Sequence, residues 1–306
     1  MKIAIFYFSG TGNTEYVSNL LKDYLTTNGH VVDVHNIEDV SEPIDVQILE
    51  NIDFFGLGFP VHAFNAPKNV FTFIKKMIPQ VSGTKAFAFR TAGDPAMKSG
   101  STSMVRKALK RKGFDVWYER RFIMPSNVFV KYEDEVTKQL YLLAEQMAEE
   151  MAAELVQSRR LQKNGLLLRI GTFLFSKMET FGMRRMAKWA YKVDDACNLC
   201  LYCVKNCPTQ TVYVREKKDT KSIKFAKSCV GCMRCIYNCP ENAINLKFMK
   251  FFQLEDGYSQ EENLAALNDP EIEANALKDD TKGFYKRFVK FFKQELGEDI
   301  FTGHTG

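Results

Sequence analysis

Residues 2–14, with the sequence KIAIFYFSGTGNT, decide the fold class of the N-terminal half. The run from Lys2 to Phe8 is apolar and β-compatible, which is typical of a strand buried on both faces of a parallel sheet. A turn rich in glycine and hydroxyl groups follows, and after it comes a helical pattern with Val17, Leu20 and Leu21 on one face. A strand, such a turn and a helix start together offer several N–H groups to a phosphate.

The turn does not match either common nucleotide motif. A P-loop needs a lysine after the turn, and there is none here. A dinucleotide fingerprint needs a third glycine, but Glu15 stands in that place. The remaining interpretation is a loop that binds a terminal phosphate monoester without a counter-cation. Its residues are Ser9, Gly10, Thr11, Gly12, Asn13 and Thr14.

Further strand and helix patterns alternate along the first 158 residues. Strands are expected at residues 31–35, 52–59 and 84–90 and within 115–124, and helices around 67–79, 101–112 and 133–158. This order predicts an α/β fold with a doubly wound, five-stranded parallel sheet. Its ligand should lie beyond the carboxyl ends of strands one, three and four, where the turn at 9–14 meets the loops at 59–65 and 91–94.

All eight cysteines lie in two runs with the same spacing. The runs are Cys197-x-x-Cys200-x-x-Cys203-x-x-x-Cys207-Pro208 and Cys229-x-x-Cys232-x-x-Cys235-x-x-x-Cys239-Pro240, 32 residues apart. The similarity continues into the residues that follow each proline, so this is an internal duplication. Each half is expected to be a metal loop followed by a short helix and a strand. Residues 212–215 and 222–225 predict a hairpin with a lysine-rich tip.

The spacing predicts two [4Fe-4S] clusters. Three thiolates two residues apart can curl around one corner of an iron–sulfur cube, and the fourth cysteine, next to proline, reaches the other cluster. Structural zinc and a disulfide lattice are the alternatives. Zinc ribbons use two separated pairs of cysteines, and a chain without an export signal favours metal over disulfides. The expected ligand sets are Cys197, Cys200, Cys203 and Cys239 for one cluster and Cys229, Cys232, Cys235 and Cys207 for the other.

Both halves resemble known families. Residues 194–247 resemble the bacterial two-cluster ferredoxins, a small α+β fold, and residues 1–158 resemble the flavodoxins. Their joining resembles the flavodoxin–ferredoxin fusion proteins found mainly in anaerobes. The resemblance implies that the turn at 9–14 binds the phosphate of FMN and that two loops flank its isoalloxazine ring. These loops are Phe59, Pro60, Val61, His62, Ala63, Phe64 and Asn65, and Thr91, Ala92, Gly93 and Asp94.

Within those loops, Phe59, His62 and Phe64 are the candidates to stack on the flavin ring. Flavodoxins commonly carry an aromatic residue after strand four, and the loop at 91–94 has none. One face of the flavin is therefore expected to be open to a substrate, a partner or the cluster domain. No catalytic residue is assigned, although His62 could donate a proton or hydrogen bond to reduced flavin.

Composition sets wider limits. The 306 residues are 45% hydrophobic and 26% charged, enough for two cores, and a net charge of +5 is too small to imply nucleic-acid binding. No secretory signal or spanning segment is visible, so a cytoplasmic location is expected. The expected division is an FMN domain (1–158), a basic amphipathic connector (159–193), a two-cluster domain (194–250), and an acidic linker with a C-terminal amphipathic helix (251–306).

The connector and the tail each allow two interpretations. The connector either docks the two domains together or presents a basic surface to an acidic redox partner, an anionic substrate or a membrane. Residues 255–280 are acidic and predict a solvated linker or lid. Phe284, Phe288, Phe291 and Phe292 share one face of the final helix, which favours packing on the body over a membrane anchor.

The leading functional hypothesis is an electron carrier in which FMN and two clusters exchange electrons and pass them between protein partners, which are ferredoxin- or flavodoxin-like. The alternative is a ferredoxin-dependent flavoenzyme that reduces a quinone, a nitro compound or an enoate on the open face of the flavin. Oxidoreductase chemistry is common to both. The oligomeric state is not determined by this sequence.

Overall fold

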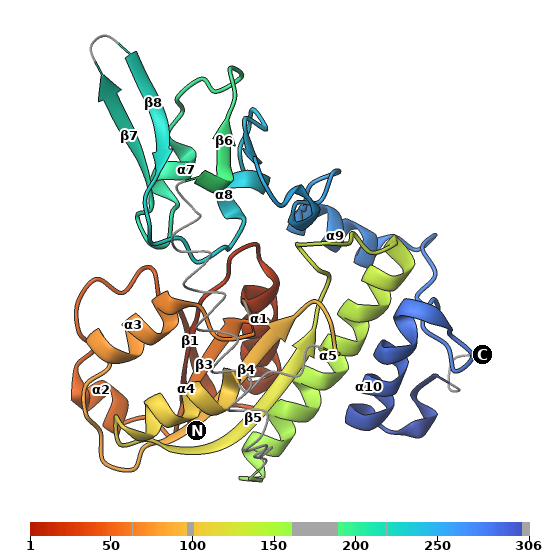
Figure 1. Cartoon of the computed structure of the whole chain (residues 1–306). Coiled ribbons are helices and arrows are strands. Elements are labelled where there is room, and N and C mark those ends of the chain that lie inside the picture. Colours follow the sequence, from red (N-terminus) through yellow and green to blue (C-terminus); the bar gives the residue numbers. More distant parts are fainter. Residues whose placement is uncertain (63, 97–100, 161–188, 218–219, 302–306) are drawn as a thin grey trace.

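The computed structural model describes residues 1–62, 64–96, 101–160, 189–217 and 220–301 (Figure 1). The predicted connector helices at 159–192 fall almost entirely on residues 161–188, outside the described residues. In the part that is described, no helix is long and apolar enough to cross a membrane.

A five-stranded parallel sheet forms the centre of the N-terminal domain, with the order β2-β1-β3-β4-β5. The strands are β1 (Lys2–Tyr7), β2 (Val31–Asn36), β3 (Phe54–Pro60), β4 (Lys85–Ala92) and β5 (Asp115–Ile123). The strand order reverses between β1 and β3, so their carboxyl ends open a crevice there. The predicted doubly wound sheet is confirmed.

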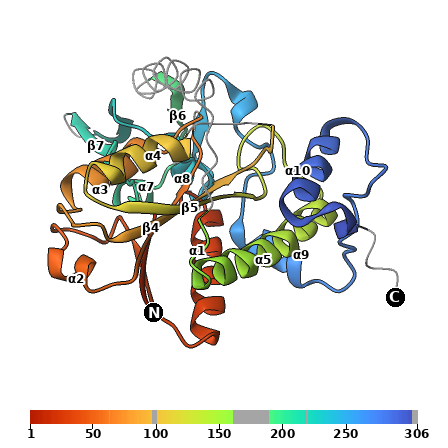
Figure 2. The ribbon, with the colours of Figure 1, turned by 90° about the horizontal axis from the view of Figure 1, so that it is seen from below.

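Helices cover both faces of this sheet (Figures 1 and 2). On one face, α1 (Asn13–Thr27) and α5 (Asp134–Val156) bury Val17, Leu21 and Leu140 against the strands. On the other face, α3 (Lys68–Lys76) and α4 (Ser101–Lys110) pack around apolar residues of β3 and β4. A short helix that the sequence pattern did not predict, α2 (Val46–Glu50), begins where the Asp45 side chain accepts a hydrogen bond from Gln47 N.

The cysteine-rich domain sits over the carboxyl end of the sheet (Figure 1). It contains β6 (Tyr191–Val193) paired with β9 (Ile244–Leu246), the hairpin of β7 (Val212–Lys217) and β8 (Thr220–Phe225), and the short helices α7 (Tyr202–Lys205) and α8 (Arg234–Tyr237). The predicted hairpin is confirmed. Strand β6 lies in the segment assigned to the connector, so the sheet of this domain begins before residue 194.

The C-terminal segment returns to the N-terminal domain. After a 3₁₀ turn at Lys250–Phe252, α9 (Gln260–Asn268) and α10 (Lys286–Leu296) lie beside α5 (Figure 2), and short 3₁₀ turns at Gly283–Tyr285 and Glu298–Phe301 flank α10. The prediction of a solvated linker at 255–280 is wrong for much of that segment, because it contains α9 and buries Tyr258 and Leu277. The Gln139 amide holds the backbone of Leu277 through two hydrogen bonds, of 2.6 and 3.0 Å.

The predicted packing of the final helix on the body is confirmed for three of its four phenylalanines. Phe288, Phe291 and Phe292 are buried in the core that α5 shares with the sheet. Phe284 is different: it precedes the helix and remains 41% exposed.

Candidate functional site

The turn after β1 has the local geometry of an anion site. Gly12 has a φ of 106°, a conformation that favours glycine, and it precedes α1 without any side-chain cap. The first N–H groups of a helix have no partners within the helix, and here they carry the positive end of its dipole. Ser9 shapes the turn because its hydroxyl oxygen accepts a hydrogen bond of 3.0 Å from Gly12 N. The turn is therefore suited to bind a phosphate.

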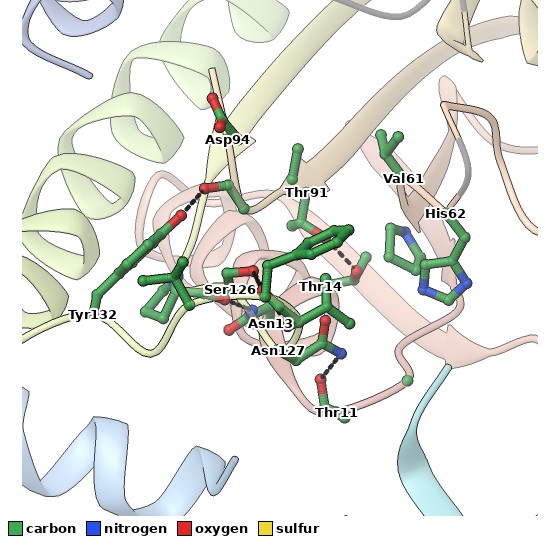
Figure 3. Close-up of a pocket in the computed structure, with 18 of the residues that line it drawn as sticks. Thr11, Asn13, Thr14, Val61, His62, Thr91, Asp94, Ser126, Asn127 and Tyr132 are labelled. Carbon is green, nitrogen blue, oxygen red and sulfur yellow. Dashed lines mark hydrogen bonds between the residues drawn. The ribbon is translucent and has the colours of Figure 1, made fainter. Parts of the chain in front are cut away.

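Neighbouring loops hold the polar side chains of this turn in place (Figure 3). The hydroxyls of Thr14 and Thr91 lie 2.8 Å apart, which joins the start of α1 to the end of β4. The Asn127 amide donates to the hydroxyl of Thr11 at 3.0 Å. Asn13 donates to the carbonyl of residue 125 at 2.9 Å. Each of these side chains is oriented by a residue distant in sequence.

A cavity of about 360 Å³ opens beside the turn. Most of the residues predicted from the turn and the two loops line it together, namely Ser9, Gly10, Thr11, Asn13, Thr14, Pro60, Val61, His62, Thr91, Ala92, Gly93 and Asp94. The cavity has phosphate-binding geometry at one end and largely apolar walls at the other. It therefore suits a ligand with a phosphate and a planar ring.

Some predicted residues do not line this cavity. Phe59 is fully buried in the core under α3, so it is not available to stack on a ring. Asn65 is buried and exchanges backbone hydrogen bonds with His62, which shapes the loop rather than the cavity wall. Phe64 has a φ of 60° and is not part of the wall, and residue 63 lies outside the described residues. Of the three stacking candidates, only His62 faces the cavity.

Other lining residues were missed by the sequence patterns. They come from the loop after β5 and from the C-terminal segment, and they are Pro125, Ser126, Asn127, Val128, Phe129, Val130, Tyr132 and Phe284. A Pro-Ser-Asn sequence directly after a parallel strand is a recognisable turn at the functional edge of the sheet, so the loop could have been proposed. Phe284 carries no such signal, because its position depends on the docking of a distant helix.

His62 connects the cavity to the cysteine-rich domain. Its ring Nδ1 lies 2.9 Å from the carbonyl oxygen of Val230. Because a carbonyl only accepts, Nδ1 carries the proton. Burial lowers the pKa of His62 to about 4, and the hydrogen bond to Val230 opposes this only in part. His62 is therefore neutral at physiological pH and joins the two domains as a hydrogen-bond donor.

The eight cysteines surround two hollows. One hollow is lined by Cys197, Cys200, Cys203 and Cys239, and these four are here called the outer site. The other is lined by Cys207, Cys229, Cys232 and Cys235, here called the inner site, and Cys203 also lines this hollow. Each hollow thus combines three cysteines of one run with the proline-flanked cysteine of the other, as the ligand assignment expects.

The cysteines are free thiols rather than disulfides. In the described ranges, no three His, Cys, Asp or Glu side chains converge on a point where one metal ion could bind. The cysteines of a [4Fe-4S] cluster do not need to converge, since each binds a different iron. Burial raises the pKa of Cys203 to about 11 and that of Cys232 to about 12, so a bound cation would favour the thiolate form at these positions.

The backbone repeats the duplication seen in the sequence. Leu199 and Leu201 in the first run have φ values of 58° and 63°, and Gly231 and Met233 at the equivalent positions of the second have 67° and 62°. These turns direct N–H groups toward sulfur, as Gly231 N does toward Cys229 Sγ at 3.3 Å. Such donors stabilise negative charge on thiolates and on a bound cluster.

Arg234 fastens the inner site to the phosphate turn. Its guanidinium donates to the carbonyl oxygens of Ser9 and Gly10, at 2.5 and 3.0 Å, and forms a two-pronged ion pair with Glu38 at 2.7 Å. The Arg234 side chain is only 15% exposed and that of Glu38 20%. A planar, forked donor of this kind cannot be replaced by lysine without losing contacts.

Gly10 and Cys232 are in close contact across the same interface. A Cβ atom at Gly10 would lie 2.9 Å from the Cys232 carbonyl oxygen and 3.0 Å from its Cβ. Tyr237 adds a hydrogen bond of 2.8 Å to the backbone oxygen of Asn127, in the loop that lines the cavity. The inner site therefore touches the same elements that form the ligand cavity.

Comparisons with known proteins agree with this geometry. Residues 4–118 match the flavodoxin domain family, and residues 196–244 match the 4Fe-4S dicluster domain family. An uncharacterised protein of Methanocaldococcus jannaschii is 35% identical over 117 residues, covering 38% of this chain and 71% of that protein.

Solved structures with a similar fold include flavodoxin 1 from Bacillus cereus, at 21% identity and a TM-score of 0.39, which covers 51% of this chain and 98% of that protein. A flavodoxin from the domain Archaea shows 14% identity and a TM-score of 0.37, with 51% and 99% covered.

The fold and the two sites define a flavin- and iron–sulfur-dependent electron-transfer protein. The chain joins the two domains in one polypeptide, with the flavodoxin domain first and the 4Fe-4S dicluster domain after it. The flavodoxin domain implies a flavin of the FMN type, and the dicluster domain implies iron–sulfur clusters. The cavity fits such a flavin, because an uncapped helix start lies at one end of it and an apolar wall at the other.

Gly12→Ala should weaken FMN binding by about tenfold, because a positive φ costs a non-glycine residue about 1–2 kcal/mol and the turn must shift to relieve it. The new methyl group would also displace the Gln260 side chain, 2.6 Å away. A fluorescence titration with FMN measures the effect. Gly29→Ala is the matched control, since its φ is also positive, at 78°, and nothing lies within 4 Å of its new Cβ. Equal affinity in the two variants would contradict the assigned role of the turn.

Proposed function

We propose that the protein carries electrons between redox partners by passing them within one chain between FMN and two [4Fe-4S] clusters. The observation that carries the proposal is the contact between the inner site and the cavity, through Val230 with His62 and through Cys232 with Gly10. A flavin exchanges one or two electrons and each cluster exchanges one, so the cofactors supply the chemistry. The protein supplies proximity, orientation and exclusion of water.

The two cluster sites have different surroundings in this proposal. The second cysteine run provides the contacts with the flavodoxin domain, and Cys232 within it is buried. Cys200, in the outer site, is exposed. The inner site is therefore the one that exchanges electrons with the flavin, and the outer site is the one that exchanges them with another protein. The partner we propose is an acidic redox protein, because the connector residues carry nine basic side chains and one acidic side chain.

Anaerobic purification followed by assays of iron, sulfide, zinc and FMN tests the cofactor content. About eight iron atoms and eight sulfides with one FMN per chain support the proposal. A colourless protein that contains zinc contradicts it.

A flavoenzyme is the second candidate, and one observation favours it. Three apolar residues on the wall of the cavity remain exposed, namely Phe129 at 45%, Val130 at 43% and Phe284 at 41%. This wall could admit a small apolar substrate to the flavin. Saturable consumption of a quinone, a nitro compound or an enoate, faster than with free FMN, would support the enzyme. Rates equal to those of free FMN, together with rapid reduction of ferredoxin or cytochrome c, would support the carrier.

A further inference from the structure

The C-terminal segment, residues 251–301, contacts the phosphate turn at one end of the cavity and lines the cavity wall elsewhere, although it lies outside the two regions that match known domain families. Near the phosphate turn, the Tyr258 hydroxyl donates to Asn13 Oδ1 at 2.8 Å, and the side chain of Gln260 covers Gly12. Near the end of β4, Phe284 forms part of the cavity wall. The flavodoxin domain alone therefore does not enclose this site.

We propose that Phe284 forms part of the aromatic wall that positions and retains the flavin ring, and that the C-terminal segment is part of the flavin site. This inference rests on the proposed function, since it assumes that FMN occupies the cavity. The loop that follows β4 has no aromatic side chain between Thr91 and Asp94, so the wall on this side is left to other elements. Among the described residues that line the cavity, Phe284 is the one that comes from the segment after the dicluster domain.

Contacts on several sides hold the Phe284 ring in place. Its centroid lies 5.8 Å from that of Phe288, which is fully buried, and 6.2 Å from that of Tyr132, another cavity residue. The hydroxyl of Tyr132 in turn donates to the carbonyl oxygen of Gly93 (Figure 3). Phe284 is thus anchored to the core through α10 and to the β4 loop through Tyr132.

Arg287 also contacts the Phe284 ring. The guanidinium carbon lies over the Phe284 ring, 3.9 Å from its centroid, and Nη1 forms an ion pair of 3.2 Å with the carboxylate of Asp94. Asp94 lines the cavity, so this pair connects the C-terminal helix to the cavity wall. The pair also neutralises the carboxylate that would otherwise face the flavin.

The exposed side chain of Phe284 is available to contact a ligand in the cavity. Phe288, Phe291 and Phe292 in the following helix α10 are buried, whereas the side chain of Phe284 is 41% exposed and lies beside the cavity. A phenylalanine fixed by a stacked arginine has little side-chain freedom left to lose when a planar ring packs against it. It is therefore preorganised to contact an aromatic ligand.

Phe284→Ala should raise the dissociation constant of FMN by about tenfold, through the loss of apolar and aromatic contact. It should also reduce the visible circular dichroism of the bound flavin, because the ring is held less rigidly. The measurement uses the anaerobically purified chain with its clusters, stripped of flavin and titrated with FMN. Phe248→Ala is the matched control, because Phe248 is 54% exposed and does not line the cavity.

The outcomes separate this inference from the proposed function. If the wild-type chain binds no FMN, the proposed function fails. Suppose instead that the wild type binds FMN. If Phe284→Ala then shows the same FMN affinity and the same flavin dichroism as the wild type and Phe248→Ala, Phe284 does not form the flavin wall. Arg287→Gln provides a second variant with Phe284 unchanged. Weaker FMN binding and a lower flavin reduction potential support the inference, since Asp94 would lose its counter-charge, and wild-type values for both oppose it.

Discussion

Cys207→Ala should abolish the cluster of the inner site, although Cys207 belongs to the first cysteine run. The flavin should then lose its electron-transfer contact with the remaining cluster. Cys207 follows the first three cysteines in sequence, but in the structure it lines the hollow of Cys229, Cys232 and Cys235. Iron should fall from about eight to about four atoms per chain, because a [4Fe-4S] cluster needs all four ligands. The flavin should then no longer be reduced by the surviving cluster on the timescale of the wild type, as stopped-flow absorbance would show.

Cys239→Ala is the matched partner of this experiment. It removes a proline-flanked cysteine of the same type from the outer site. The iron loss should be the same, yet electron transfer between the inner cluster and the flavin should persist. If Cys207→Ala preserved that transfer and Cys239→Ala abolished it, the assignment of the inner and outer sites would be reversed.

Arg234→Ala should slow electron transfer between the domains without removing either cofactor. The substitution removes the hydrogen bonds to Ser9 and Gly10 and leaves Glu38 without its mostly buried partner. A loss of about 2 kcal/mol in docking would raise the ratio of undocked to docked protein roughly 30-fold, so the intramolecular rate should fall, by up to about 30-fold. Stopped-flow reduction of the flavin measures that rate, and iron and FMN assays confirm the cofactors.

Two further variants separate docking from a general effect of charge. Arg215→Ala removes an exposed arginine of β7 in the same domain and should leave the rate unchanged. Arg234→Lys keeps the charge but not the forked geometry, so it should fall between the wild type and Arg234→Ala. An unchanged rate in Arg234→Ala would show that this interface is not the route between the cofactors.

The sequence alone predicts those features of the fold and sites that depend on residues close together in the chain. The strand and turn at residues 2–14 and the duplicated cysteine spacing are local signals, and in the structure the residues of each lie together around a hollow. The prediction that Phe59 could stack on the ring is wrong, because the sequence does not show which way a side chain at the end of a strand points. The strand continues to Pro60, and the Phe59 side chain points into the core.

Long-range docking could not be predicted in the same way. Residues 255–280 resemble a linker in composition, yet α9 forms there because it packs against α5. One difference between the repeats could have been noticed: Arg234 in the second run occupies the position of Tyr202 in the first. The two runs share their cysteine spacing and differ at several positions between the cysteines, and at this position the arginine contacts the phosphate turn.

The most direct test follows flavin reduction after the clusters receive electrons rapidly and anaerobically from a small one-electron reductant, at several protein concentrations. Contact between the inner site and the flavin cavity predicts a first-order rate that does not change with protein concentration, because both cofactors belong to the same chain. A rate that increases in proportion to protein concentration would mean that electrons pass between molecules, and this would contradict transfer across the interface formed by His62, Gly10 and Arg234.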